Sequence, residues 1–554
     1  MRRLLQPTAP PYDPLVWVRQ PLGERGRQVC EAWALHGYGT PIAAYALYAI
    51  KLGLYVGAWI AWCGFTPGLG GLTTIGDWWL HPIAFQKAIL WSMLFEGLGL
   101  GCGSGPLTGR YSPPVGGCLY FLRPGTTKLA AWRRLGLRRT WFDVALYLAI
   151  VVGLGAALAS ATPPRALLIA IAIAVPVLGL CDRTTFLAFR SEHYWTTIVC
   201  LIVAGDWIAG AKAVQLALWF WAGFSKLNHH FASVVCVMTS NGPFTRWPAL
   251  RKRMYRSYPD DLRPSRLAVV LGHVGTALEL SVPVVLALAP GGTALTVGLV
   301  MMIVLHVYIT SNVPMGVPLE WNVMVAYGGF ALFYAHPDVT VLDLGSTPLA
   351  IFLGVMLVIG PRGGNLWPHR WSFLLSMRYY AGNWAYGVWL FRGDSYRKLA
   401  RLTTSAPWIH DQLARFYDRA TAVGLIGKVL GFRLMHLHGR ALPILIPRAV
   451  DCFEDHEYVD GELIAGMVLG WNFGDGHLHR EPLLHAVQAQ CGFEPGELRC
   501  IFVEAQPLGG TSLAYRIVDA ATGSIEDGSL AVAELRTRQP WSAACHDPAT
   551  IDRP

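Results

Sequence analysis

Apolar runs alternate with polar connectors along roughly the first 390 residues. Most of these runs approach the length of about 20 residues that a helix needs to cross a bilayer. They cover residues 41–65, 81–101, 141–159, 165–180, 194–209, 214–235, 267–289, 295–312, 320–334 and 349–360. The pattern predicts an all-α polytopic membrane domain over residues 40–392, with about ten transmembrane helices.

The pattern changes on either side of this region. Residues 1–39 read as a cytoplasmic N-terminal lead. Residues 393–450 are helical and basic, which predicts a connector along the membrane surface. Residues 451–541 alternate short apolar runs with turns, for example at 500–504 and 515–519, which predicts a small soluble α+β domain. Residues 542–554 are expected to be a disordered tail.

The charge distribution supports a membrane protein. Only 14% of the residues are charged, against about 25% in soluble domains. The net charge of +10 could indicate a nucleic-acid partner, but the basic residues gather in connectors such as 102–140 and 244–266. The positive-inside rule explains that arrangement better. We therefore expect a multi-pass protein of the inner (plasma) membrane with both termini cytoplasmic. Its partners would be membrane lipids rather than nucleic acid, and residues 451–541 offer a surface for a cytoplasmic protein.

The segment 216–230 places polar groups at the end of an apolar run. It contains Lys226, Asn228, His229 and His230. On one continuous helix, His229 and His230 would neighbour Lys226 at i+3 and i+4. A lysine held away from water can serve as a general base, so Lys226 is the first catalytic candidate. In the alternative interpretation, Lys226 extends to the membrane interface and the histidines lie there with it.

Further ionisable or amide side chains lie inside apolar runs. They are Glu96, His273, Glu279, His306 and Asn312. Intramembrane polar groups usually face a bundle interior, so we predict a polar cluster around a cavity. Glu279 and His306 would assist Lys226 in catalysis, whereas Glu96, His273, Asn312, Asn228, His229 and His230 would bind substrate. In the alternative, these groups satisfy one another as structural ion pairs and hydrogen bonds.

Two other groups of polar residues are assigned no catalytic or binding role. The pairs His436/His438 and His477/His479 suggest metal ligands, but no clear strand pattern surrounds them. We therefore predict a solvated polar surface there and no metal site. Residues 182–183 and 190–193 are predicted to lie at the membrane interface.

Two short motifs resemble a known family. The string Ala222-Gly223-Phe224-Ser225-Lys226-Leu227 resembles the Ala-Gly-x-x-Lys-Leu motif of the vitamin K-dependent γ-glutamyl carboxylase superfamily, whose bacterial branch is called HTTM. The segments 305–318 and 321–325 resemble the next parts of that pattern, and the resemblance covers residues 40–340. It implies that Lys226 occupies the position of the base that deprotonates a hydroquinone, and it allows a quinone-like cofactor. The carboxylase's large lumenal domain has no counterpart here.

A narrower resemblance covers more of the chain. The basic lead, the ten-run layout and the segment 508–520 are similar to bacterial membrane proteins grouped as a family of unknown function, of the DUF3556 type. From these resemblances and the intramembrane polar residues, the leading hypothesis is that the protein is a membrane-embedded enzyme. It would act on a lipid or quinone-like substrate with Lys226 as its base. The alternative is a non-enzymatic lipid or small-solute transporter or a membrane assembly factor.

Overall fold

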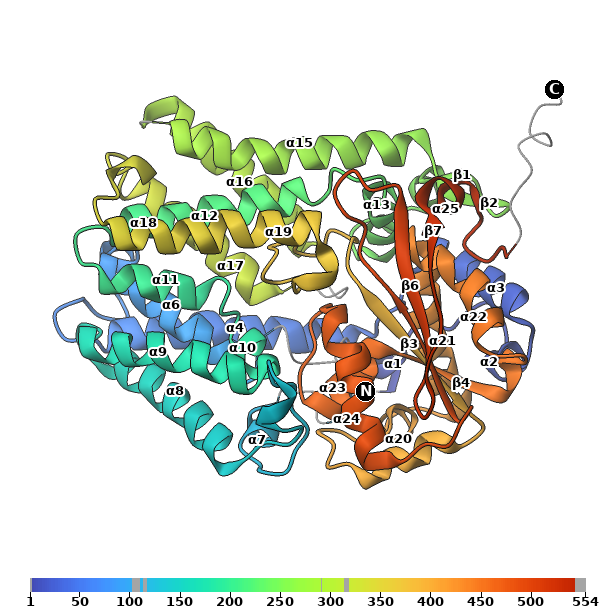
Figure 1. Ribbon diagram of the computed structural model, residues 1–554. Helices are drawn as coiled ribbons and strands as arrows, with labels where there is room; N and C mark the ends of the chain where they lie inside the picture. The colour runs from blue at the N-terminus through green and yellow to red at the C-terminus, as the bar shows by residue number, and fades with distance from the viewer. Residues whose placement is uncertain (1, 102–109, 113–116, 290, 313–317, 544–554) are drawn as a thin grey trace.

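The computed structural model describes residues 2–101, 110–112, 117–289, 291–312 and 318–543. The molecule is mostly helical, and a sheet lies at one end (Figure 1). Helices α4 to α19 form a bundle, which we call the helical bundle. The segment 386–537 contains the sheet with its helices, which we call the sheet unit. The expected tail after residue 543 and the 313–317 part of the second motif lie outside the described residues.

Five helices of the described chain are long and apolar enough to cross a membrane. They are α4 (Ile42–Gly64), α8 (Trp141–Ala159), α15 (Arg266–Leu288), α16 (Gly292–Thr310) and the helix Thr347–Leu366, which begins as α18 (Thr347–Gly354). A bent pair, Arg419–Met435 with His438–Ala449, raises the number to six if it counts as one span. The expected number of about ten is therefore not confirmed.

The other apolar runs fold into shorter pieces. The run at 81–101 becomes α6 (Pro82–Gly97), and the run at 165–180 becomes α9 (Arg165–Cys181). The runs at 194–209 and 214–235 are divided differently, into α11 (Tyr194–Ile202), α12 (Trp207–Phe224) and α13 (Phe231–Asn241). Turns interrupt the runs at 81–101, 194–209 and 214–235, so no single helix covers any of them, whereas α9 covers its whole run but has only 17 residues.

The sheet has five strands in the order β4-β3-β5-β6-β7, with all neighbours antiparallel. The strands are β3 (Tyr386–Arg392), β4 (His456–Asp460), β5 (Leu498–Val503), β6 (Ser512–Asp519) and β7 (Gly523–Ala531). Strands β5 and β6 coincide with the apolar runs at 500–504 and 515–519. Strand β3 belongs to the range that the sequence assigns to the membrane domain, and its side chains are buried on both faces of the sheet up to Phe391.

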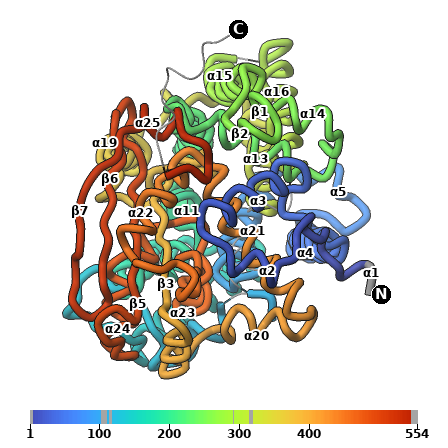
Figure 2. The backbone as a smooth tube through the Cα atoms, turned by 90° about the vertical axis from the view of Figure 1, so that its right-hand side faces the viewer, coloured from blue at the N-terminus to red at the C-terminus, as the bar shows by residue number. Residues whose placement is uncertain are grey.

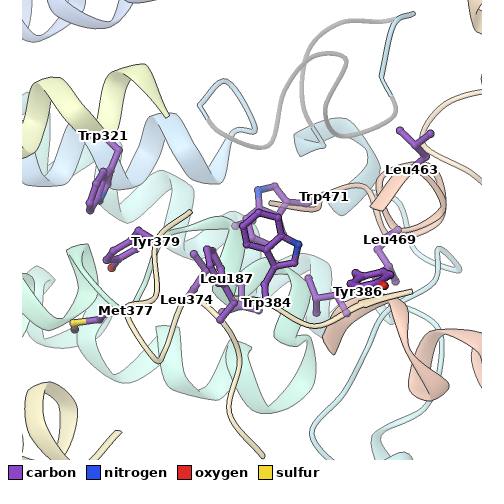
Figure 3. Packing of buried hydrophobic residues seen from close by; sticks show 14 of the residues in the cluster. Leu187, Trp321, Leu374, Met377, Tyr379, Trp384, Tyr386, Leu463, Leu469 and Trp471 are labelled. Carbon is purple, nitrogen blue, oxygen red and sulfur yellow. The ribbon is translucent and has the colours of Figure 1, made fainter. Parts of the chain in front are cut away.

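One hydrophobic core joins the helical bundle to the sheet unit. The rings of Trp321 on α17 (Leu319–Gly328) and Tyr379 lie with centroids 4.6 Å apart and planes tilted by 39°. Figure 3 shows these rings with Trp384 and Trp471, all within the same cluster of buried residues. Because the cluster is continuous, a separate C-terminal domain is not confirmed.

The N-terminal lead packs against the sheet unit. Helix α3 (Leu22–His36) lies along α21 (Arg419–Met435), and α2 (Pro14–Trp17) contacts α21 as well (Figure 2). Most of α21 is buried, which differs from the exposed membrane-surface connector expected for 393–450. Its Arg433 is neutralised inside the protein, because Asp460 and Glu462 accept hydrogen bonds from its guanidinium at 2.6 and 2.8 Å.

Candidate functional site

Lys226, Asn228, His229 and His230 lie in the turn between two helices rather than on one continuous helix. Helix α12 ends at Phe224, and α13 begins at Phe231. The N–H groups of Lys226 and Leu227 donate to the carbonyls three residues earlier, at 3.1 and 3.2 Å, and this tighter pattern closes the helix. The expectation that Lys226, His229 and His230 share one helical face is therefore wrong.

Lys226 and Glu279, two members of the expected polar cluster, nevertheless meet. The Lys226 ammonium donates to the Glu279 carboxylate, and both side chains are buried. The ring of Phe231 lies 5.2 Å from the Lys226 nitrogen. Gly223 permits this contact: a Cβ atom there would lie 3.0 Å from Leu280 on α15. The absence of a side chain at 223 lets α12 and α15 approach closely enough for the pair to form.

His306 is held by two hydrogen bonds. Its Nε2 accepts from Trp219 Nε1 at 2.9 Å, and its Nδ1 lies 2.9 Å from Asn322 Oδ1. The Asn322 amide nitrogen donates to Pro318 O, so its oxygen is the acceptor toward His306. This arrangement assigns the neutral tautomer with the proton on Nδ1. His306 is thus a fixed polar group with both ring nitrogens engaged. Trp219 lies on α12, seven residues before Lys226 in the sequence.

A cavity of 590 Å³ lies between α4, α16 and α17, and His306 and Asn322 form part of its wall. Most other lining residues are apolar or aromatic, including Tyr45, Tyr48, Leu52, Phe244, Ile303, Val307, Val323 and Ala326. Val307 and Phe244 are exposed, so the cavity reaches the outer surface of the helical bundle. A mostly apolar cavity with a few fixed polar groups is typical of small-molecule sites.

The remaining candidates lie apart from this cavity. His229 and His273 are exposed. Glu96 is buried on α6, a helix that packs against α4, α8 and α11, whereas Lys226 and Glu279 belong to the contact between α12 and α15. Asn312 is buried, and its amide donates to Tyr308 O at 2.7 Å, which closes the end of α16. The structure therefore brings together Lys226 with Glu279 but not the larger expected cluster.

Asn228 and His230 connect the helical bundle to the sheet unit. Asn228 donates to Pro507 O at 3.1 Å and accepts from the Gly509 N–H at 3.0 Å, so it holds the loop between β5 and β6. His230 is buried, and its ring lies 5.9 Å from that of His438. Both residues have structural surroundings rather than an open binding surface.

The paired histidines do not lie on the solvated surface that the sequence indicates. His436, His438 and His479 are all buried, the first two close to His230 of the helical bundle and His479 within the sheet unit. Chain segments that are distant in the sequence cover these histidines, so the local sequence pattern does not predict their burial. Among the described residues, no group of three or more His, Cys, Asp or Glu side chains is arranged to hold a metal ion.

His477 belongs to a buried ion network. It contacts Asp475 at 3.3 Å and Glu504 at 3.2 Å, and Arg480 also binds Glu504. Burial alone would lower the pKa of His477, but its hydrogen bonds to the two carboxylates raise the pKa above its usual value. Burial opposes ionisation of Glu504 as well, yet the hydrogen bond and charge of His477, with the charge of Arg480, hold the Glu504 pKa at about 2. The network ties residues 475–480 to the end of β5.

Sequence reasoning missed a buried arginine. Arg190 was expected at the membrane interface, but it is fully buried, and its guanidinium lies 5.1 Å from Trp321, 5.3 Å from Tyr379 and 5.1 Å from Phe473. Its φ is 51°, and Met377, near Tyr379, has the same value. Such conformations are retained only where the surroundings enforce them. The aromatic enclosure comes from three distant segments, so no local signal in the sequence indicates it.

Buried polar side chains in an apolar helical bundle, with a cavity between three of its helices, define an integral membrane protein with internal polar sites. The chain belongs to the family described as transmembrane protein of unknown function (DUF3556), which matches residues 3–552. No curated protein and no solved structure matches it.

Proposed function

We propose that this protein binds a lipid or quinone-like amphiphile in the 590 Å³ cavity between α4, α16 and α17. The observation that carries the proposal is the composition of the cavity wall. Aliphatic and aromatic side chains form most of it, and His306 and Asn322 supply a fixed polar edge. An apolar body would bury surface against the wall, and a polar head would be oriented by the edge.

The position of the cavity supports entry from the bilayer. Its wall includes α4 and α16, two helices long and apolar enough to span a membrane. Exposed Val307 and Phe244 lie at its margin, so a ligand dissolved in the lipid could enter between helices. His306 and Asn322 at the polar edge already have hydrogen-bond partners within the protein. No polar group is therefore left unpaired when the cavity holds only an apolar chain.

Binding is tested with purified full-length protein in lipid nanodiscs. A short-chain quinone and a labelled fatty acid are titrated against the wild type and Ala326→Trp, which fills the cavity. Ile351→Trp, on an exposed face of another membrane helix, is the matched control. We expect saturable binding of at least one probe, lost in Ala326→Trp and kept in Ile351→Trp. Equal binding by all three proteins would contradict the proposal.

An enzymatic role is the second candidate, and the buried Lys226–Glu279 pair favours it. A carboxylate beside a lysine can take its proton and leave the amine available as a base. The resemblance of residues 222–227 to the carboxylase/HTTM motif supports the same role. Lys226 does not line the cavity; Trp219, on the helix that precedes Lys226, donates a hydrogen bond to His306 in the cavity wall.

The two candidates differ in what Lys226 must do. In a deletion strain, Lys226→Ala and Lys226→Arg are expressed at wild-type level, and the lipid and quinone pools are measured. An enzyme requires that both variants fail and that a lipid or quinone species accumulates. If Lys226→Ala complements while Ala326→Trp does not, the protein handles its ligand without chemistry at Lys226, as a transporter or assembly factor would.

We further propose that the protein resides in the inner membrane with both ends cytoplasmic. The basic connector 244–266 and the packing of α3 against α21 support this orientation, because the N-terminal and C-terminal parts lie at one end of the helical bundle. Exposed Cys452 should resist an impermeant maleimide in intact spheroplasts. A Leu342→Cys variant, in the 336–346 connector, should react. The reverse pattern would contradict the orientation.

A further inference from the structure

A second cavity, of 540 Å³, lies outside the helical bundle. It is enclosed by α2, α20 (Ile409–Leu413), α21 and strand β4. The three helices lie next to one another in Figure 2. The cavity shares no lining residue with the 590 Å³ cavity, and of these elements only α21 belongs to a candidate span, as half of the bent pair Arg419–Met435 with His438–Ala449. The cavity is therefore separate from the proposed amphiphile site.

One side of this cavity is apolar. Ala422, Val423, Ile426 and Leu430 of α21 face it, and Leu15 and Val18 from the N-terminal segment lie across from them. These positions recur at helical spacing along α21, so they form a continuous strip. Tyr396 and Trp408 also line the cavity and stack on each other with centroids 4.5 Å apart. The strip and the aromatic pair provide a surface for the apolar part of a ligand.

The other side carries a buried cation with an unused donor. Arg25 is 5% exposed, and its guanidinium lies between the rings of Trp17 and Phe453, at 4.8 and 4.5 Å. Its Nε has no hydrogen-bond partner among the described residues, and the same holds for the hydroxyl of Tyr458, a residue 6% exposed. Both residues line the cavity. Buried donors are almost always satisfied, so these two atoms indicate an absent acceptor.

The charges around the cavity favour an anion. Arg19 and Arg419 line it together with Arg25, and the two carboxylates are Asp411 and Glu457. Glu457 already binds His410 at 2.8 Å, so it is engaged within the wall. Guanidinium groups recognise carboxylates and phosphates through directed N–H donors.

We propose that this cavity binds a small amphipathic anion, an apolar body that carries one carboxylate or phosphate group. The anionic group accepts hydrogen bonds from Arg25 Nε and the Tyr458 hydroxyl. The apolar body lies along the strip of α21 residues. A purely inorganic anion would leave that strip uncovered, and a neutral alcohol would offer Arg25 Nε no charged acceptor.

The test uses full-length protein in nanodiscs and titration calorimetry with four probes: hexanoate, hexyl phosphate, hexanol and inorganic phosphate. We expect saturable binding of hexanoate, hexyl phosphate or both, and at least tenfold weaker binding of hexanol and inorganic phosphate. The preferred anion distinguishes a carboxylate from a phosphate ligand. Equal affinity for hexanol would overturn the anion assignment, and equal affinity for inorganic phosphate would overturn the amphipathic one. Absence of saturable binding would overturn the whole proposal.

Variants locate the site. Arg25→Gln should weaken binding about tenfold, because it removes a charged hydrogen bond. Arg27→Gln, on the exposed side of the same helix, is the matched control and should bind as the wild type does. Tyr458→Phe removes only a hydroxyl that has no hydrogen-bond partner among the described residues, so this variant should fold even if Arg25→Gln does not. It should weaken binding severalfold. Unchanged affinity in Tyr458→Phe, or in a folded Arg25→Gln, would overturn the proposed contacts.

Discussion

Lys226 and Glu279 form a buried ion pair across the contact between α12 and α15, and Gly223 makes that contact close enough. Gly223 lies near the end of α12 and Lys226 just beyond it, whereas Glu279 lies on α15, more than 50 residues further along the chain. A buried pair of this kind costs desolvation that its own attraction only partly offsets, so its presence is weak evidence of a purely stabilising role.

Enlarging residue 223 should separate the two helices. The Cβ of Gly223→Ala would meet Leu280 at 3.0 Å, and Gly223→Leu would add further overlap. We expect a loss of about 1–3 kcal/mol in the free energy of unfolding, larger for leucine. SDS-induced unfolding in mixed micelles measures it. Gly155→Ala on α8, where the new atom meets nothing within 4 Å, is the control and should not destabilise.

Removing one member of the ion pair should harm the protein more than removing both. Glu279→Leu leaves a buried ammonium without its partner, which typically costs about 3–5 kcal/mol. The double variant Lys226→Met/Glu279→Leu keeps the volume and removes both charges, so its stability should return close to that of the wild type. The same unfolding assay measures all three proteins. A double variant as unstable as the single one would show that the pair is required by the fold.

Asn228 should control the loop between β5 and β6. Asn228→Ala removes the bonds to Pro507 O and the Gly509 N–H, each contributing about 1 kcal/mol. Amide hydrogen exchange of residues 506–510 should accelerate, while exchange in β3 stays unchanged. Thr537→Ala, whose hydroxyl bonds only to Glu534 O, should leave the loop as it is. Unchanged exchange in Asn228→Ala would contradict a clamping role.

The network around His477 should make stability depend on pH in both directions. Glu504 has a pKa of about 2 in the folded protein, below its ordinary 4.5, so its contribution is present above pH 4.5 and is lost as the pH falls toward 2. The pKa of His477 is raised above 6.5, so its contribution is present below pH 6.5 and is lost as the pH rises through the raised value. Stability from the network is therefore greatest between about pH 4.5 and 6.5.

Thermal unfolding followed by tryptophan fluorescence, in one detergent across this pH range, measures the effect. His477→Gln should abolish the decline on the alkaline side and reduce the decline on the acid side, because Glu504 loses its hydrogen-bonded partner. A variant with the same alkaline decline as the wild type would assign that decline to another group.

Several elements of the fold could be read from the sequence. The helices α4, α8, α15 and α16 coincide with apolar runs of sufficient length, and β5 and β6 with short runs flanked by turns. Composition determines these elements locally. The break at Ser225–His230 could not be read in this way, because apolar residues continue on both sides of it.

Within the candidate site, the sequence predicts Lys226 and Glu279 only as members of one polar cluster that also includes Glu96 and His306, because buried charges need partners. The roles of His306 and Asn228 were not predictable, because each depends on a residue brought near by tertiary packing: Trp219 and Asn322 for His306, and Gly509 for Asn228. Burial of His436, His438 and Arg190 depends in the same way on contact between the helical bundle and the sheet unit.

The central claim, that the cavity beside His306 holds an amphiphile, is tested most directly by mass spectrometry of the lipids that copurify with the protein. Wild type, Ala326→Trp and Ile351→Trp are purified in the same detergent. We predict a lipid or quinone species enriched with the wild type and Ile351→Trp and depleted from Ala326→Trp. The same species at the same level in all three would contradict the claim.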